Sequence, residues 1–247
     1  MTLRPRRGMV LAAGLGLRMR AVSETLPKPL VPLAGRPLIA HALGRLAQAG
    51  VDEIVVNTHH RAEQVESFLA AHAALPGAPR IRISREAERL ETGGGVRRAL
   101  PRLGDGPFYV LNSDVVLVEG DAPALARLAW AWDEAAMDAL LLLCPRARMA
   151  GHAGAGDFFR EPDGRLVRRG AAPGAPFVFT GVQLLHARLF AAAPDGAYSL
   201  NRHYDEAIGR GRLFGLVHRG LALHVGSPAG LAEAARILGG GTGGEGG

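Results

Sequence analysis

An alternation of short apolar runs with amphipathic stretches constrains the fold of this 247-residue chain more than any other feature. Apolar runs bounded by turn residues fit buried strands, and stretches with apolar residues every three or four positions fit helices packed on a sheet. This alternation is typical of a Rossmann-like α/β fold with a mixed, mostly parallel central sheet flanked by helices. Strands are expected at 8–13, 54–57, 81–84, 108–112, 139–144, 177–185, 213–217 and 221–225, a hairpin at 158–167, and helices from Pro37, at 62–71, from Val96, and at 123–136, 201–209 and 228–238.

The chain length suits a single compact domain, which we expect to span residues 1–238. Residues 239–247 contain seven glycines in nine positions. Such a segment cannot bury enough apolar surface to offset the entropy of ordering it, so a disordered tail is expected there.

The cysteine content indicates a reducing compartment. Cys144 is the only cysteine and lies in the apolar run 139–144, so we expect a core residue with neither a disulfide framework nor a Cys/His metal cluster. The first ten residues carry three arginines but lack a long apolar segment with a cleavage site, which argues against a secretory signal. The expectation is a cytoplasmic protein that does not act at a membrane.

The basic residues favour small phosphorylated ligands over nucleic acid. The net charge is +6, but the arginines are scattered and few aromatic residues lie among them, so no basic stripe stands out and no nucleic-acid partner is expected, with an RNA-binding module as the alternative. Of 29 basic residues, 28 are arginine and the single lysine is Lys28. Because lysine is a compact point charge and arginine a wide planar fork, a narrow site facing one phosphate oxygen would require the lysine.

A glycine loop follows the first expected strand. Gly14 and Gly16 would let backbone N–H groups approach an oxyanion at the carboxyl edge of the sheet, and Arg18 would add charge. A dinucleotide fingerprint is disfavoured because Met19 stands where a third small residue is needed and residues 33–36 lack an acidic side chain. A P-loop is excluded because the only lysine follows a proline.

Two charged residues complete this candidate site. Lys28 lies between Pro27 and Pro29, which predicts an extended segment that aims the side chain at phosphate, with a rigid surface turn as the alternative. Asp114 follows the buried strand 108–112 and would reach the same sheet edge, where a carboxylate can hold Mg²⁺ against phosphate oxygens. The alternative for Asp114 is a turn or helix-capping residue.

Taken together, two segments resemble the opening of the sugar-1-phosphate nucleotidylyltransferases: residues 11–20, LAAGLGLRMR, and residues 26–38, LPKPLVPLAGRPL. The similarity continues through 50–54, 112–114, 179–181 and 225–228, and so covers 8–238. It implies the nucleotide-diphospho-sugar transferase fold and transfer of a nucleoside monophosphate from an NTP to a sugar-1-phosphate, with Mg²⁺ and release of pyrophosphate. The implied roles are catalysis for Arg18, Lys28 and Asp114, nucleotide binding for Ala13, Gly14, Gly16, Glu91, Thr92, Gly93, Gly94 and Asn112, and sugar binding for Gly156, Asp157, Thr180 and Gly181.

Within that family, residues 90–95, LETGGG, resemble the base-reading loop of the uridylyltransferases that activate N-acetylmuramate 1-phosphate in cell-wall recycling. Its glycines would let the backbone lie against uracil, so UTP and that sugar phosphate are the expected substrates. A bare connector before the helix from Val96 is the alternative. Mannose-1-phosphate guanylyl transfer, glucose-1-phosphate thymidylyl or uridylyl transfer, and a catalytically silent regulatory subunit also stay open, as does the oligomeric state.

One position departs from the family. Relatives commonly carry a second metal-binding aspartate before Val-Gly-Thr, whereas this chain has His224 before Val225. Imidazole is a poor ligand for the hard Mg²⁺ ion, so His224 is expected to contact a metal-bound water or a phosphate, or to bind the metal weakly.

Overall fold

The computed structural model describes residues 3–19 and 25–239. The tail predicted at 239–247 lies outside these residues except for Gly239, which ends the last helix, α6 (Pro228–Gly239). Strands and helices alternate as predicted, and none of the helices in the described ranges is both long and apolar enough to cross a membrane.

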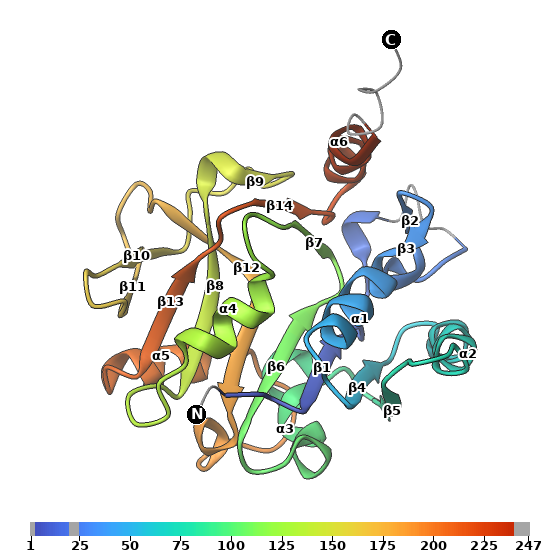
Figure 1. Cartoon of the computed structure of the whole chain (residues 1–247), viewed down its shortest axis with the longest axis horizontal. Helices are drawn as coiled ribbons and strands as arrows, with labels where there is room; N and C mark the ends of the chain where they lie inside the picture. Colours follow the sequence, from blue (N-terminus) through green and yellow to red (C-terminus); the bar gives the residue numbers. More distant parts are fainter. Residues whose placement is uncertain (1–2, 20–24, 240–247) are drawn as a thin grey trace.

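A mixed sheet forms the centre of the molecule, as Figure 1 shows. Seven strands follow one another in the order β13-β8-β12-β6-β1-β4-β5, and among these only β12 runs antiparallel to its neighbours. A hairpin of β10 and β11 pairs with the start of β12. The strands are β1 (Arg7–Leu11), β4 (Glu53–Thr58), β5 (Arg80–Arg85), β6 (Pro107–Asn112), β8 (Ala139–Pro145), β10 (Phe158–Arg160), β11 (Leu166–Arg168), β12 (Phe177–His186) and β13 (Leu213–Val217).

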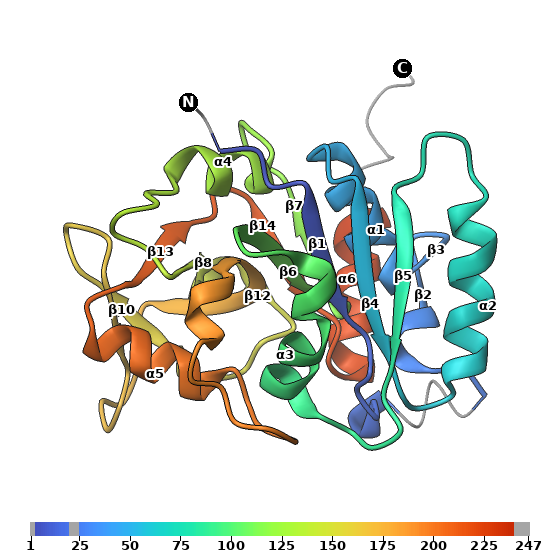
Figure 2. The ribbon, with the colours of Figure 1, turned by 90° about the horizontal axis from the view of Figure 1, so that it is seen from below.

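Helices cover both faces of this sheet (Figures 1 and 2). Alternate residues of the strands point to opposite faces, so Val10 packs with α1, α2 and α4 on one side, whereas Met9 packs with α3 and α5 on the other. Cys144 lies in the first of these clusters, as predicted for a core residue. The helices are α1 (Leu38–Gln48), α2 (Ala62–Ala73), α3 (Glu91–Leu103), α4 (Ala124–Ala131) and α5 (Asn201–Gly209).

A second, three-stranded sheet packs against α1 through β7. It has the order β7-β14-β9, and α6 packs against it. Of its strands, only β14 was expected from the sequence. The bounds are β7 (Val115–Val118), β9 (Met149–Ala150) and β14 (Leu221–His224), and a separate ribbon consists of β2 (Pro32–Leu33) and β3 (Arg36–Pro37).

Several predicted boundaries need correction. Pro37 ends β3 and α1 begins at Leu38, while Gly50, with a φ of +76°, follows the helix as expected. The helix predicted at 123–136 ends at Ala131 because the backbone of Trp132 is extended. The largest difference is α3, which begins at Glu91 and so includes the three glycines predicted to form a loop.

Candidate active site

The ends of the central strands border a cavity of about 370 Å³. The strand register makes this possible, because Leu11 at the end of β1 lies beside both Asn57 of β4 and Asn112 of β6. Eight predicted site residues meet here. The lining consists of Leu11, Ala12, Ala13, Gly14, Gly16, Lys28, Pro29, Asn57, Arg89, Glu91, Thr92, Asn112, Ser113, Asp114 and Ser199.

The glycine loop bends closely around Lys28. Gly16 has a φ of +62°, and a Cβ atom added to it would lie 2.9 Å from the Cβ of Lys28. Only glycine accepts both that backbone conformation and that contact without strain. Gly14 is exposed, and the space where its Cβ would be is open, which leaves room for a ligand above the loop.

Lys28 pairs with Asp114 at the rim of the cavity. Pro27 is extended as predicted, but Lys28 begins a single 3-10 turn, η2 (Lys28–Leu30), so the expectation of an extended segment through Lys28 is wrong. The turn points the ammonium inward, where its Nζ atom lies 2.5 Å from Oδ2 of Asp114. Both side chains are mostly buried, at 14% and 20% exposed, so this charge pair is shielded from bulk water.

His224 lies beside the same carboxylate. The antiparallel pairing of β14 with β7 sets His224 opposite Val115, and the N–H of Val225 donates to the carbonyl of Asp114 over 2.8 Å. The Nε2 atom of His224 is 3.8 Å from Oδ2 of Asp114. Burial lowers the pKa of His224; the Asp114 charge opposes this effect, and Lys28 adds to it.

Arg18 is the one predicted catalytic residue that does not line the cavity. It is exposed in a 3-10 turn, η1 (Leu17–Met19). A Cβ atom added to Gly226 would lie 3.2 Å from a guanidinium nitrogen of Arg18, so the side chain reaches the turn that follows His224.

The residues around Asp114 can accommodate a divalent cation. Asp114 offers carboxylate oxygen and His224 offers imidazole nitrogen, while the described residues contain no cluster of three or more His, Cys, Asp or Glu side chains suited to a metal. Ions of this kind often take one or two protein ligands and complete their shell with water and phosphate oxygens. The site therefore fits an ion that arrives together with a nucleotide.

The opposite wall rests on a buried hydrogen-bond network that sequence reasoning missed. Asn57 Oδ1 accepts from the N–H of Ala12 over 2.8 Å, and its Nδ2 donates to Glu86 over 2.8 Å. The other oxygen of Glu86 accepts from the N–H of Leu90 over 3.0 Å. Asn57 and Glu86 are 2% and 3% exposed, so this network connects the glycine loop to the start of α3. Asn57 ends the strand predicted at 54–57, and this position could have identified it as a candidate site residue.

The glycines of α3 lie in a helix and not in the predicted loop, and nucleotide binding by Gly93 and Gly94 stays a prediction. Gly93 and Gly94 are buried in the first turns of the helix, and both N–H groups donate to the carbonyl of Tyr198, over 2.8 and 3.2 Å. A Cβ atom on Gly93 would lie 2.3 Å from the Tyr198 ring. The glycines therefore allow a neighbouring segment to pack closely, whereas Glu91 and Thr92 line the cavity.

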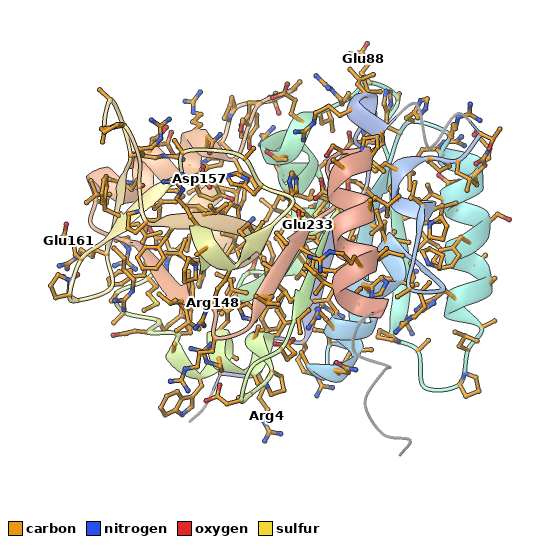
Figure 3. All side chains as sticks on the ribbon, turned by 90° about the horizontal axis from the view of Figure 1, so that it is seen from above. Arg4, Glu88, Arg148, Asp157, Glu161 and Glu233 are labelled. Carbon is orange, nitrogen blue, oxygen red and sulfur yellow. The ribbon has the colours of Figure 1, made fainter. Side chains whose placement is uncertain are left out.

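The four residues predicted on the sugar side lie outside the cavity lining. In Figure 3, Asp157 lies in the half of the molecule that holds β10 and β12. Its carboxylate accepts from the N–H of Phe179 over 2.8 Å, and the fully buried Thr180 donates its hydroxyl to Leu142 over 2.8 Å. Gly156 and Gly181 have φ values of +88° and +77°. These contacts serve the fold, and sugar binding by these residues stays a prediction.

Two relatives match the chain over nearly its whole length, and a family model matches most of it. Residues 8–207 match the family model described as MobA-like NTP transferase domain. N-acetylmuramate alpha-1-phosphate uridylyltransferase of Caulobacter vibrioides is 42% identical over 239 residues, covering 96% of this chain and 99% of that protein. The protein of the same name from Neisseria meningitidis is 37% identical over 94% of this chain and 98% of its own length. Mannose-1-phosphate guanyltransferase of Hypocrea jecorina is 42% identical, but over only 44% of this chain and 30% of its own length.

Solved structures agree on the fold. A UDP-glucose pyrophosphorylase complexed with UDP-glucose superposes with a TM-score of 0.79 at 17% identity, covering 96% of this chain and 99% of that chain. The inositol-1-phosphate CTP transferase from T. maritima gives 0.77 at 17% identity, covering 97% and 99%. At this identity the likeness establishes the nucleotide-diphospho-sugar transferase fold that the sequence predicted.

Proposed function

The chain belongs to the MobA-like NTP transferase family, and from that membership we propose that it transfers UMP from UTP to N-acetylmuramic acid α-1-phosphate and releases pyrophosphate. Similarity over nearly the full length of two relatives that bear this activity in their names supports the choice of substrates. The observation that carries the chemistry is the pairing of Lys28 with Asp114 at 2.5 Å beside an open glycine loop. An ammonium and a carboxylate placed there can separate to receive a phosphate and a divalent cation.

The proposed reaction forms one phosphoanhydride bond and breaks another. An oxygen of the sugar phosphate attacks the α-phosphorus of UTP, and the bond from that phosphorus to the pyrophosphate oxygen breaks in line. The attacking oxygen is already an anion, so the reaction needs no general base. Catalysis then depends on positioning the two phosphates and neutralising their charge.

The phosphates would be held by the wall of the cavity that carries the charges. Gly14 and Gly16 would offer backbone N–H groups, and Lys28 would offset the charge at the reacting phosphates. Arg18, reaching from its exposed turn, would hold the leaving pyrophosphate. Asp114 would hold the divalent cation, which supplies charge neutralisation at the phosphate oxygens when bound; Mg²⁺ is the ion expected from the sequence.

The base and the sugar would occupy the rest of the cavity. Glu91 and Thr92 at the start of α3, Ala13, and Asn112 line it beside the glycine loop and are proposed to position the nucleoside. Gly156, Asp157, Thr180 and Gly181 remain the candidates for the sugar side. We place the reaction in the cytoplasm, in the recycling of cell-wall sugars, and assign it to the single domain 1–238.

A substrate panel tests the proposal. Purified protein would be offered each of five NTPs with N-acetylmuramic acid, N-acetylglucosamine, glucose and mannose 1-phosphates, and pyrophosphate release would be measured while mass spectrometry identifies the nucleotide sugar. We expect UTP with N-acetylmuramic acid α-1-phosphate to be preferred at least tenfold, about 1.4 kcal/mol. GTP with mannose 1-phosphate as the best pair would refute it, and no pyrophosphate from any pair would indicate a silent subunit.

A further inference from the structure

The position of His224 bears on which metal ion the site selects. Its Nε2 atom lies 3.8 Å from the Oδ2 atom of Asp114. Two ligands at about 2.1 Å from one octahedral ion are about 3.0 Å apart when adjacent and about 4.2 Å apart when opposite. The observed separation falls between these limits, so one ion could contact both side chains after a small adjustment.

The imidazole ring is held in place from several sides. A Cβ atom added to Gly151 would lie 2.4 Å from the carbonyl oxygen of His224, and the N–H of Gly151 donates to Glu233 of α6 over 2.8 Å (Glu233 is labelled in Figure 3). A Cβ atom added to Gly226 would lie 2.4 Å from Cε1 of His224, so only a glycine lets the chain turn so closely under the ring. The close backbone around His224 therefore leaves its ring little room to move.

The donor set is therefore mixed. Asp114 provides a hard oxygen and His224 a softer nitrogen, and no third His, Cys, Asp or Glu in the described ranges joins them. Imidazole suits first-row transition ions better than Mg²⁺, and affinities of mixed sites rise from Mn²⁺ toward Co²⁺. Both ions also accept the octahedral arrangement and phosphate oxygens that a nucleotide would supply.

We propose that Asp114 and His224 bind the same divalent ion and that His224 shifts the preference of the site from Mg²⁺ toward Mn²⁺ and Co²⁺. The role of the ion in catalysis rests on the proposed function, but the ligand set and the metal preference do not. Lys28 shares the Oδ2 atom of Asp114, so its ammonium has to move toward a phosphate when the ion binds. Binding should accordingly be tighter with a nucleotide than without one.

Binding of Mn²⁺ tests this directly. Pulsed EPR of Mn²⁺ added to the full chain, alone and with a UTP analogue that is not cleaved between the α- and β-phosphates, reports whether a histidine nitrogen is coordinated. We expect nitrogen coupling in the wild type and its loss in His224→Asp and His224→Ala. His152→Gln is the matched control, because the His152 ring lies 6.2 Å from that of His224 and should leave the coupling intact.

Competition between metals supplies the second readout. Titrating Mg²⁺ against bound Mn²⁺ gives the ratio of the two dissociation constants, and His224→Asp should move that ratio at least tenfold toward Mg²⁺. Nitrogen coupling absent from the wild type, or a ratio unchanged in His224→Asp, would overturn the proposal. Neither measurement uses the sugar phosphate, and the titration with metal alone does not use the nucleotide. A wrong substrate assignment would therefore leave both interpretable.

Discussion

The two walls of the cavity differ in how their polar groups are bonded. The charged wall, formed by Gly14, Gly16, Lys28 and Asp114 with His224 beside Asp114, contains charged groups whose contacts with each other a substrate can replace. The scaffold wall, formed by Asn57 and Thr92 and backed by Glu86, Tyr198 and His203, contains groups whose polar atoms already bond to fixed protein partners. Changes in the charged wall should alter rate, whereas changes in the scaffold wall should alter stability.

Asp114→Ala should produce the largest effect. Without the carboxylate the divalent ion loses its oxygen ligand and Lys28 loses its partner, so turnover should fall by a factor on the order of 10³ or more at any practical Mg²⁺ or Mn²⁺ concentration. Pyrophosphate release at saturating metal measures this. Asp121→Ala is the control, since Asp121 pairs with Arg219 on the surface and should be silent. Substantial activity in Asp114→Ala would remove Asp114 from the mechanism.

Lys28→Arg tests whether the shape of the Lys28 ammonium group matters as well as its charge. Gly16 lies against the Lys28 side chain, so a planar guanidinium cannot follow the same path to the phosphate. We expect kcat to fall roughly 100-fold, about 2.7 kcal/mol, with the unfolding midpoint nearly unchanged. Arg102→Lys, an exchange at an exposed position of α3, should have no effect. Near-normal turnover in Lys28→Arg would show that the lone lysine has no special role.

A substitution in the scaffold wall should lower the stability of the protein more than its turnover. Asn57→Ala leaves the N–H of Ala12 without its acceptor and removes a donor from Glu86, both in the interior. Unsatisfied buried groups of this kind cost about 2–4 kcal/mol in total. Urea unfolding measures the loss, and Asn201→Ala at an exposed position is the control. A stable Asn57→Ala protein that has lost turnover would break the distinction between the walls.

The two walls also differ in how far the sequence predicts them. Lys28 and the glycine loop lie close together in the chain, and Asp114 follows a strand, so local patterns located them. Asn57 and Glu86 are joined to each other across 29 residues, and Asn57 to Ala12 across 45, and a single sequence carries little signal for such pairs. Asn57 nonetheless lies one residue before the end of β4, lines the same cavity as Asp114 and was open to the same argument.

Tertiary packing overrode local preference in α3. The loop was predicted from the resemblance of residues 90–95 to a base-reading loop, and glycine is also a poor helix former. In the fold, the carbonyl of Tyr198 accepts from two of their N–H groups and its ring occupies the space of a missing side chain. The fold class and most strands were predictable because apolar periodicity is local. The small sheet of β7 and β9 was missed because its strands are short and pair only through β14.

The smallest expected effect concerns pH and the scaffold wall. His203 is fully buried, its Nε2 atom lies 3.2 Å from the Tyr198 hydroxyl, and burial lowers its pKa below 6.5 despite the raising effect of Glu206. As the pH falls through 6.5, the unfolded chain takes up a proton at this position before the folded protein does. Stability therefore decreases, until the pH passes below the folded pKa and the penalty becomes constant.

His203→Gln removes this titration while retaining a polar side chain, so its melting temperature should fall less between pH 7.5 and 5.5 than that of the wild type. Carboxylates with lowered pKa values, such as Asp138 and Glu134, lose their stabilising contribution only below this range, so histidines dominate within it. His41, His72, His186 and His218 also have lowered pKa values, so the variant should flatten the profile only in part, by about 1 kcal/mol or less.

Differential scanning fluorimetry at five pH values measures the change in melting temperature, with His59→Gln as a control. An identical fall in both proteins would mean that His203 is not coupled to folding through its proton, and that the scaffold wall depends on its packing against Phe190 instead.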